Sequence, residues 1–219
     1  TDTKNLLFKK YFSKRIRKNY DSIAYTTIIT HSKISNNTAE QFFTKYGPLA
    51  FLPISNTKTS IVFSVFDQDL IKNKLKIRKL IESYNKNYQI KDMKELESFP
   101  LNLSLSRNYF HKNILSFGDA LHKIHPLAGQ GFNMTIRDIR SLSNILDENI
   151  RLGINDGGLI AKKFEENNKH LNFIYGLGID TINSFFKLDS KLNNALSEPI
   201  FKILKGNRFL NNYATFLSN

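Results

Sequence analysis

The residues best suited to chemistry lie in one short stretch, Gly118–Asn133, of the 219-residue chain. An apolar run ends at the pair Gly118-Asp119, and from Phe132 onward apolar residues recur at intervals of three and four. This pattern predicts a buried strand, a shaped loop and then an amphipathic helix. Glycines and an asparagine at the start of a helix leave backbone N–H groups unpaired, and the helix dipole adds partial positive charge. We therefore expect this stretch to bind an anion or the electron-rich edge of a ring.

Other chemistries have weaker support in the same stretch. His122 and His125 are three residues apart, as in some metal pairs, but no third or fourth ligand stands nearby at metal-ligand spacing. The chain has no G-x-S-x-G sequence for a nucleophilic serine. A role for His125 as a general base is left open. We therefore expect no metal ion and assign no side chain as a catalyst.

The composition limits the class of protein. The chain has no Cys, which excludes disulfides and thiolate chemistry, and it has no apolar run near the roughly 20 residues of a membrane span. No secretory signal is visible at the start of the sequence. The net charge of +13 raises the question of nucleic acid, but the cations are spread along the chain apart from one dense cluster. A solvated surface, or attraction to an anionic membrane face, is preferred. The cluster consists of Lys9, Lys10, Lys14, Arg15, Arg17 and Lys18.

Periodicity predicts mainly strands in the first half of the chain. Residues 1–20 are typical of a short basic helix. Residues 67–98 predict one helix carrying Leu70 to Ile81 and a shorter helix carrying Ile90, Met93 and Leu96. Between these helical parts, short runs rich in β-branched and aromatic residues predict an antiparallel sheet. Its expected strands are Ser22–Thr30, Glu40–Tyr46, Pro48–Ile54 and Thr59–Phe66.

The second half is predicted to be mainly helical. Strict alternation over 99–105 predicts a strand with one dry face, and a buried strand over 113–117 leads into Gly118. A helix is expected over 131–148, ended by Asn149 and Gly153, with further helical spacing from 156 to the end of the chain. The expected fold class is therefore α+β or α/β.

The run from Gly118 to Asp138 resembles the second FAD-binding signature of the aromatic-ring flavoprotein hydroxylases. It is most similar to the ubiquinone-biosynthesis hydroxylases, which favour G-D-A-A-H-x-x-H-P-x-A-G-Q-G-x-N-x-G-x-x-D. Two positions depart from the pattern, Leu121 where a small residue is usual and Thr135 where Gly is usual, and neither departure removes a polar contact. So many matches at fixed spacing make a specific signal. The matching residues are Gly118, Asp119, His122, His125, Pro126, Ala128, Gly129, Gln130, Gly131, Asn133 and Asp138.

The resemblance implies a p-hydroxybenzoate-hydroxylase-like fold with an incomplete FAD-binding domain. Residues 1–21 would be a linker helix from the N-terminal FAD-binding part, and residues 22–106 an antiparallel-sheet substrate domain. Residues 107–150 would hold the returning strand, the flavin motif and its helix. Residues 151–219 would form a C-terminal helical region.

The resemblance also implies which residues hold the flavin. Asp119 would accept a hydrogen bond from a ribityl hydroxyl, and the start of the helix would face the pyrimidine edge of the ring. A weaker likeness to the family's A-D-G-x-x-S-x-L-R pattern marks Asp2 as a further candidate, with a helix N-cap as the alternative. The implied cofactor-binding residues are Gly118, Asp119, Pro126, Ala128, Gly129, Gln130, Gly131, Phe132 and Asn133.

Hydroxylases of this kind use FAD, NAD(P)H and O2, here implying a polyprenylated aromatic precursor of ubiquinone as substrate. The 219 residues contain no G-x-G-x-x-G for the ADP half of FAD, so we expect the C-terminal portion of such an enzyme. The alternative is a non-catalytic remnant or accessory protein that binds a quinone-like ligand or a partner hydroxylase. We expect a cytoplasmic location, with peripheral contact at the inner membrane face and hydroxylase-complex partners left open, and no nucleic acid.

Overall fold

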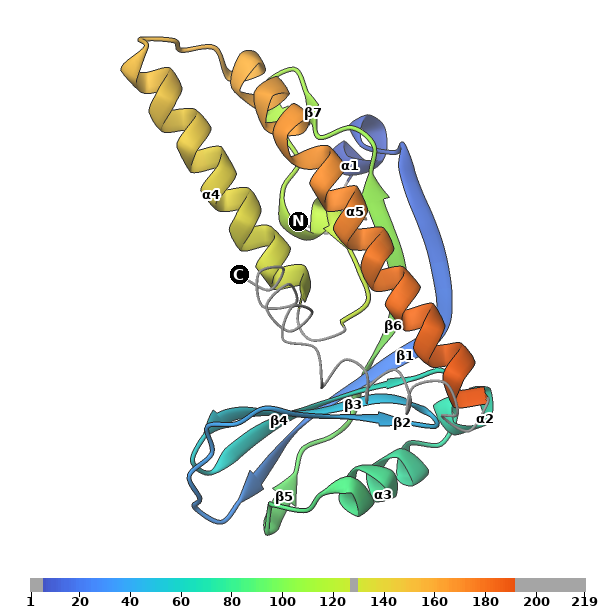
Figure 1. Ribbon diagram of the computed structural model, residues 1–219. Coiled ribbons are helices and arrows are strands. Elements are labelled where there is room, and N and C mark those ends of the chain that lie inside the picture. Colours follow the sequence, from blue (N-terminus) through green and yellow to red (C-terminus); the bar gives the residue numbers. More distant parts are fainter. Residues whose placement is uncertain (1–5, 127–129, 192–219) are drawn as a thin grey trace, which may run out of the picture. The chain divides into compact units, whose positions relative to one another are not determined.

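The computed structural model describes residues 6–126 and 130–191, which belong to two compact units (Figure 1). Among the described residues, unit 1 comprises 6–18, 102–126 and 130–183. Unit 2 comprises residues 19–101 and 184–191. Strands β1 (Arg15–His31) and β6 (Glu97–Ser106) contribute residues to both.

Unit 2 is built on an antiparallel sheet. Strand β3 pairs with β2 on one side and β4 on the other, while β4 and β5 both pair with β1. Branched and aromatic side chains dominate these strands because they pack well on a pleated surface. Besides β1, the strands are β2 (Glu40–Thr44), β3 (Gly47–Ser55), β4 (Lys58–Val65) and β5 (Ile90–Met93). The predicted strands between 22 and 66 and their antiparallel pairing are confirmed.

The core of unit 2 lies between this sheet and helix α3 (Lys74–Tyr84), which Figure 1 shows along one face of the strands. Ile77 and Ile81, four residues apart on α3, are completely buried in one apolar cluster with Phe51 of the sheet. The short helix α2 (Gln68–Ile71) precedes α3. Asn73 separates them because its side chain accepts from the N–H of Lys76 and so caps α3.

Unit 1 contains a pair of long helices, the second of which continues past residue 183 into unit 2. Helix α4 (Gln130–Arg151) and helix α5 (Gly157–Lys191) lie side by side in Figure 1. Ile145 of α4 and Phe164 of α5 share a buried apolar cluster with Tyr109 and Leu121. The smaller elements of the unit are α1 (Leu6–Tyr11), β7 (Phe110–His111), β8 (Ile114–Leu115), the 3₁₀ turn η1 (Gly118–Ala120) and β9 (His122–Lys123).

Several elements differ from those predicted. The N-terminal helix ends at Tyr11, and the residues from Arg15 onward already form β1. The shorter helix expected near Ile90 is the strand β5, because its apolar residues pair against β1. The predicted helix from Leu70 to Ile81 is divided at Asn73.

The strand expected over 113–117 was also wrong, and the helix ends shift slightly. Residues 114–115 form a hairpin with β7, and Ile114 is 43% exposed. Helix α4 extends to Arg151, and Asn149 lies inside it with its side-chain amide bonded to the carbonyl of Ile145. The apolar stripes expected beyond residue 191 lie outside the described residues. No helix among those described is long and apolar enough to cross a membrane.

We predict that Gly47→Ala destabilises unit 2 strongly. Gly47 has a φ of 135°, and a Cβ added there would lie 1.9 Å from the carbonyl oxygen of Ser64. We expect a loss of about 2–4 kcal/mol in the free energy of unfolding, measured by urea titration with far-UV circular dichroism. Gly178→Ala in α5 is the control, since no atom lies within 4 Å of its added Cβ. Equal urea midpoints for the two variants would contradict this reading of Gly47.

Candidate functional site

The motif residues gather around η1 and the start of α4. Gly118 has a φ of 61°, in the left-handed region that glycine tolerates without strain. Asp119 is exposed within η1, whereas the sequence predicted it at a strand end. Pro126 is also exposed. Ala128 and Gly129 lie outside the described residues, as does Asp2.

The start of α4 carries backbone N–H groups that have no acceptor within the helix itself. Helix geometry leaves the N–H groups of the first turn without partners inside the helix. No acidic side chain stands in that turn to neutralise the positive end of the dipole. Gln130 and Gly131 are half-buried, while Asn133 is exposed and Phe132 is 71% exposed. The helix start can therefore bind an electron-rich group approaching from solvent.

Turn η1 lies against α4, so Asp119 and these donors belong to one site. A Cβ added to Gly118 would lie 3.8 Å from Cγ2 of Thr135, at ordinary contact distance. The hydroxyl of Thr135 donates back to the carbonyl of Gly131 at 3.1 Å. The site thus combines a carboxylate that accepts hydrogen bonds with a helix start that donates them.

Arg15 also holds η1 in place. Its guanidinium donates to the carbonyl of Ala120 at 2.6 Å and to that of Leu121 at 3.4 Å. It also donates to the hydroxyl of Ser104 at 2.6 Å. Burial lowers the pKa of Arg15 to about 10, so it stays charged at neutral pH. The sequence analysis counted Arg15 among the solvated cations of the basic cluster. In the structure its guanidinium instead holds the backbone of Ala120 and Leu121.

A buried polar network connects the motif to both long helices. His122 Nε2 lies 2.7 Å from Asp138 Oδ2. The Asn172 side-chain amide donates to both Asp138 oxygens at 3.2 and 3.3 Å and to the Tyr109 hydroxyl at 3.1 Å. Arg137 in turn donates to the Asn172 carbonyl oxygen. His122, Asp138, Asn172 and Tyr109 are each at most 1% exposed.

This network fixes where α4 starts relative to η1. A buried carboxylate is tolerated only with partners, and Asp138 has one on β9 and one on α5. Burial raises the pKa of Tyr109 to about 12, which keeps its hydroxyl neutral. Sequence reasoning gave His122 and Asp138 no role, although both match the motif. Nothing in the sequence marked Asn172 or Tyr109 as a member of this network.

His125 is a neutral buried side chain. Burial lowers its pKa to about 4, against a smaller raising effect of Asp180. Its ring is only 2% exposed, so it is poorly placed to exchange protons with solvent. In the part of the chain described, no group of three His, Asp or Glu side chains is arranged to hold a metal ion.

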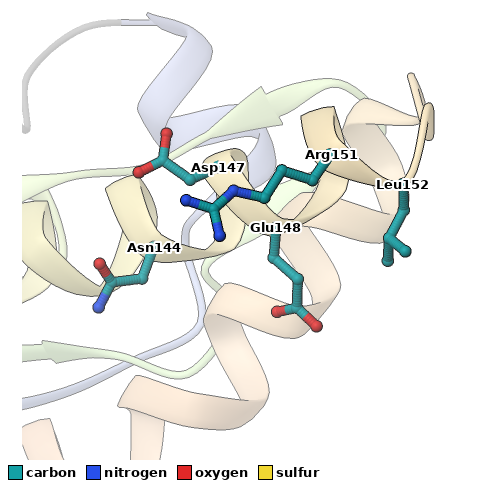
Figure 2. A pocket seen from close by; sticks show the side chains of 5 residues that line it. All are labelled: Asn144, Asp147, Glu148, Arg151 and Leu152. Atoms are coloured by element: carbon teal, nitrogen blue, oxygen red, sulfur yellow. The ribbon is translucent and has the colours of Figure 1, made fainter.

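A surface hollow at the far end of α4 is distinct from this site. It measures about 390 Å³ and is lined by Asn144, Asp147, Glu148, Arg151 and Leu152 (Figure 2). Its lining mixes both signs of charge, and Glu148 is already paired with Lys163 at 2.7 Å. The hollow lies at the C-terminal end of the helix whose N-terminal end borders Asp119. It therefore adds nothing to the candidate site.

A family described as FAD binding domain matches residues 3–159, more than half of the chain. The matched region contains η1, β9, α4 and the antiparallel strands. It also contains Asp119, His122 and Asp138. The match therefore covers the residues on which the candidate site depends, apart from Asn172.

The chain is also similar to several curated proteins. The ubiquinone biosynthesis monooxygenase COQ6 of Dictyostelium discoideum is 37% identical over 94 residues, covering 42% of this chain and 19% of the relative. That of Homo sapiens is 29% identical over 170 residues, covering 58% and 36%. The ubiquinone hydroxylase UbiL of Rhodospirillum rubrum is 27% identical over 147 residues, covering 63% and 34%. The chain spans less than half the length of these relatives.

Solved structures share the fold. PqsL, a probable FAD-dependent monooxygenase of Pseudomonas aeruginosa, gives a TM-score of 0.62 at 17% identity, covering 80% of this chain and 51% of that one. OxyS anhydrotetracycline hydroxylase of Streptomyces rimosus gives 0.65 at 15% identity, covering 96% and 43%. The predicted p-hydroxybenzoate-hydroxylase-like fold, with an antiparallel sheet and C-terminal helices, is confirmed.

We predict that Asp138→Ala costs about 3–5 kcal/mol in the free energy of unfolding. The change removes the partner of His122 and leaves the buried Asn172 amide with one acceptor fewer. Asp147→Ala is the matched control, because Asp147 is an exposed carboxylate on the same helix (Figure 2). Chemical denaturation of both variants measures the difference. A loss below about 1 kcal/mol for Asp138→Ala would mean that the network does not stabilise the site.

We predict that His125 makes stability depend on pH between 7 and 5. Its pKa of about 4 in the folded chain lies below the ordinary histidine value of 6.5, so the unfolded chain binds the proton first as the pH falls. Stability should therefore fall as the pH decreases, by about 2 kcal/mol from pH 7 to pH 5. His125→Gln should lose this part of the dependence, whereas His170→Gln, at an exposed position, should keep it. Identical pH profiles for wild type and His125→Gln would refute the assignment.

Proposed function

The chain belongs to the FAD binding domain family, and on that basis we propose that it forms the riboflavin side of the flavin site in an FAD-dependent aromatic-ring monooxygenase. The substrate class that fits best is the aromatic ring of a polyprenylated ubiquinone precursor. The relatives named as ubiquinone biosynthesis monooxygenases and ubiquinone hydroxylase support that class.

The proposal is based on the position of Asp119, which is exposed on η1 beside α4. The N–H groups in the first turn of that helix have no acceptor within the helix. A ribityl chain offers hydroxyl donors, which suit a carboxylate acceptor. The pyrimidine end of a flavin is electron-rich and becomes anionic on reduction, which suits the N–H groups of Gln130, Gly131 and Asn133. The donor set of this site therefore fits the riboflavin part of FAD.

Bound FAD would supply the redox chemistry of hydroxylation, with NAD(P)H as the reductant and O2 as the oxygen source. The residues of this chain have the separate task of binding and orienting. Asp119 holds the ribityl chain, and the start of α4 stabilises negative charge at the pyrimidine edge. The left-handed Gly118 lets the backbone approach closely. Arg15 holds η1 in position, and the pair His122–Asp138 holds β9 against α4.

The 219 residues contain no G-x-G-x-x-G sequence, so they would form only half of a flavin site. The ADP half of FAD would be held by a segment that carries that fingerprint in the same enzyme. We assign Pro126, Ala128 and Gly129 to the proposed site because they match the family motif. The substrate domain of the enzyme would be the sheet of unit 2.

We predict that Asp119→Ala weakens flavin binding about 10- to 100-fold, because it removes a charged acceptor. The purified chain is titrated into FAD and, in parallel, into FMN, which lacks the AMP part of FAD and keeps one phosphate, and flavin fluorescence is followed. The two flavins should bind with similar affinity if only the riboflavin side is recognised. Asp147→Ala again serves as the control and should bind as the wild type does.

Two results would contradict this proposal. Unchanged affinity in Asp119→Ala would remove that residue from the site. Failure of the folded chain to bind either flavin would favour the alternative, an accessory protein for a quinone-like ligand or a partner hydroxylase.

A further inference from the structure

The two positions at which the motif departs from the family pattern have different surroundings. Leu121 is 1% exposed and belongs to the apolar cluster of Tyr109, Ile145 and Phe164. Its bulk is therefore directed into the core of unit 1. Thr135 is half-buried in the second turn of α4, where its side chain faces η1. Of the two departures, Thr135 is the one that changes the candidate site.

The side chain of Thr135 lies opposite Gly118. A Cβ added to Gly118 would be 3.8 Å from Thr135 Cγ2 and 4.0 Å from Thr135 Oγ1, so both atoms border the start of η1. Asp119 is the next residue of that turn and is exposed. Thr135 therefore borders the part of the site that we assign to the ribityl chain.

The hydroxyl of Thr135 is oriented by one hydrogen bond. It donates to the carbonyl of Gly131, one turn earlier in α4, at 3.1 Å. Threonine inside a helix often bonds in this way to the carbonyl of residue i−4. The bond uses the single hydrogen of the hydroxyl, so Oγ1 can act toward a ligand only as an acceptor. Within the described residues, no N–H or O–H group donates to it.

An acceptor in this place suits the chemistry of a flavin side chain. The ribityl chain carries several hydroxyl groups, and each of them can donate one hydrogen bond. Asp119 can accept from one of these hydroxyls. The glycine of the family pattern would leave no second acceptor beside Gly118, whereas Thr135 provides one.

We propose that Thr135 is a further binding residue for the ribityl chain, with Oγ1 accepting a hydrogen bond from one hydroxyl while Asp119 accepts from another. The contact rests on the proposed function, since it needs a flavin bound at Asp119. It makes this chain more selective for a hydroxylated side chain on the flavin ring than a glycine at the same position would.

Riboflavin and lumiflavin test the proposal, because they share the same ring system and lumiflavin has a methyl group in place of the ribityl chain. The wild-type chain should bind riboflavin more tightly than lumiflavin, measured by the change in flavin fluorescence. Thr135→Val removes the hydroxyl and keeps nearly the same shape. It should weaken riboflavin binding about three- to tenfold and change lumiflavin binding by less than about twofold.

Lumiflavin also reports whether the start of α4 is intact, because its ring would contact the N–H groups there. Thr135→Ser keeps the hydroxyl and its bond to Gly131, so it should bind riboflavin as the wild type does. Ser143→Ala is the matched control, since Ser143 is an exposed hydroxyl on the same helix. It should leave both affinities unchanged. Circular dichroism of each variant checks that it is folded.

The possible failures have separate meanings. Unchanged riboflavin affinity in Thr135→Val would overturn the contact and leave the flavin site itself in place. Equal losses for riboflavin and lumiflavin would also overturn it, since the hydroxyl would then act only by supporting the helix. Tighter riboflavin binding by Thr135→Gly would mean that the side chain obstructs the ribityl chain. A wild type that binds neither flavin would overturn the proposed function, and the Thr135 contact with it.

Discussion

The contact between His122 and Asp138 is the interaction on which the candidate site depends. Both groups are fully buried, and an isolated carboxylate in such a place would be strongly unfavourable. Their contact joins strand β9 to the third turn of α4, and Asn172 extends it to α5. An exposed site is thereby held by a rigid buried support, which is what binding of a cofactor in one orientation requires.

Two different contacts support η1 and the strand that follows it. One is electrostatic and internal to the motif, between His122 of β9 and Asp138 of α4. The other is a cation donating to backbone carbonyls, through Arg15 at the start of β1. The motif residues Asp119 and Gly131 can remain open to a ligand because neither is needed to hold the turn in place.

Much of this arrangement could be predicted from the sequence, and the failures have physical causes. The strands between 22 and 66 and the helix after Gly131 have strong periodic patterns, so they were predicted correctly. Ile90 and Met93 were assigned to a helix because three apolar residues at helical spacing do not reveal pairing with β1. Asp119 was expected at the end of a buried strand, but Ile114 turns toward solvent in a hairpin. Local patterns do not contain such long-range information.

The roles of individual side chains were harder to predict than the elements that carry them. Arg15 was counted with the exposed lysines around it, and only tertiary contacts with Ala120 and Ser104 show that it is structural. Asn172 and Tyr109 are 63 residues apart and match no motif. By contrast, the turn at Gly118 and the start of α4 were located from the sequence, because a Gly-Asp pair and the onset of helical apolar spacing are local features.

The long sequence separations in the buried network have a consequence for folding. Arg15 bonds to a carbonyl 105 residues away, and Asn172 bonds to a hydroxyl 63 residues away and to a carboxylate 34 residues away. Contacts of this kind require closure of large loops, so they form slowly and only after the helices have docked. We therefore expect the site to be one of the last parts of unit 1 to be completed during folding. Acquisition of a bound ligand would therefore report that the whole unit has reached its native packing.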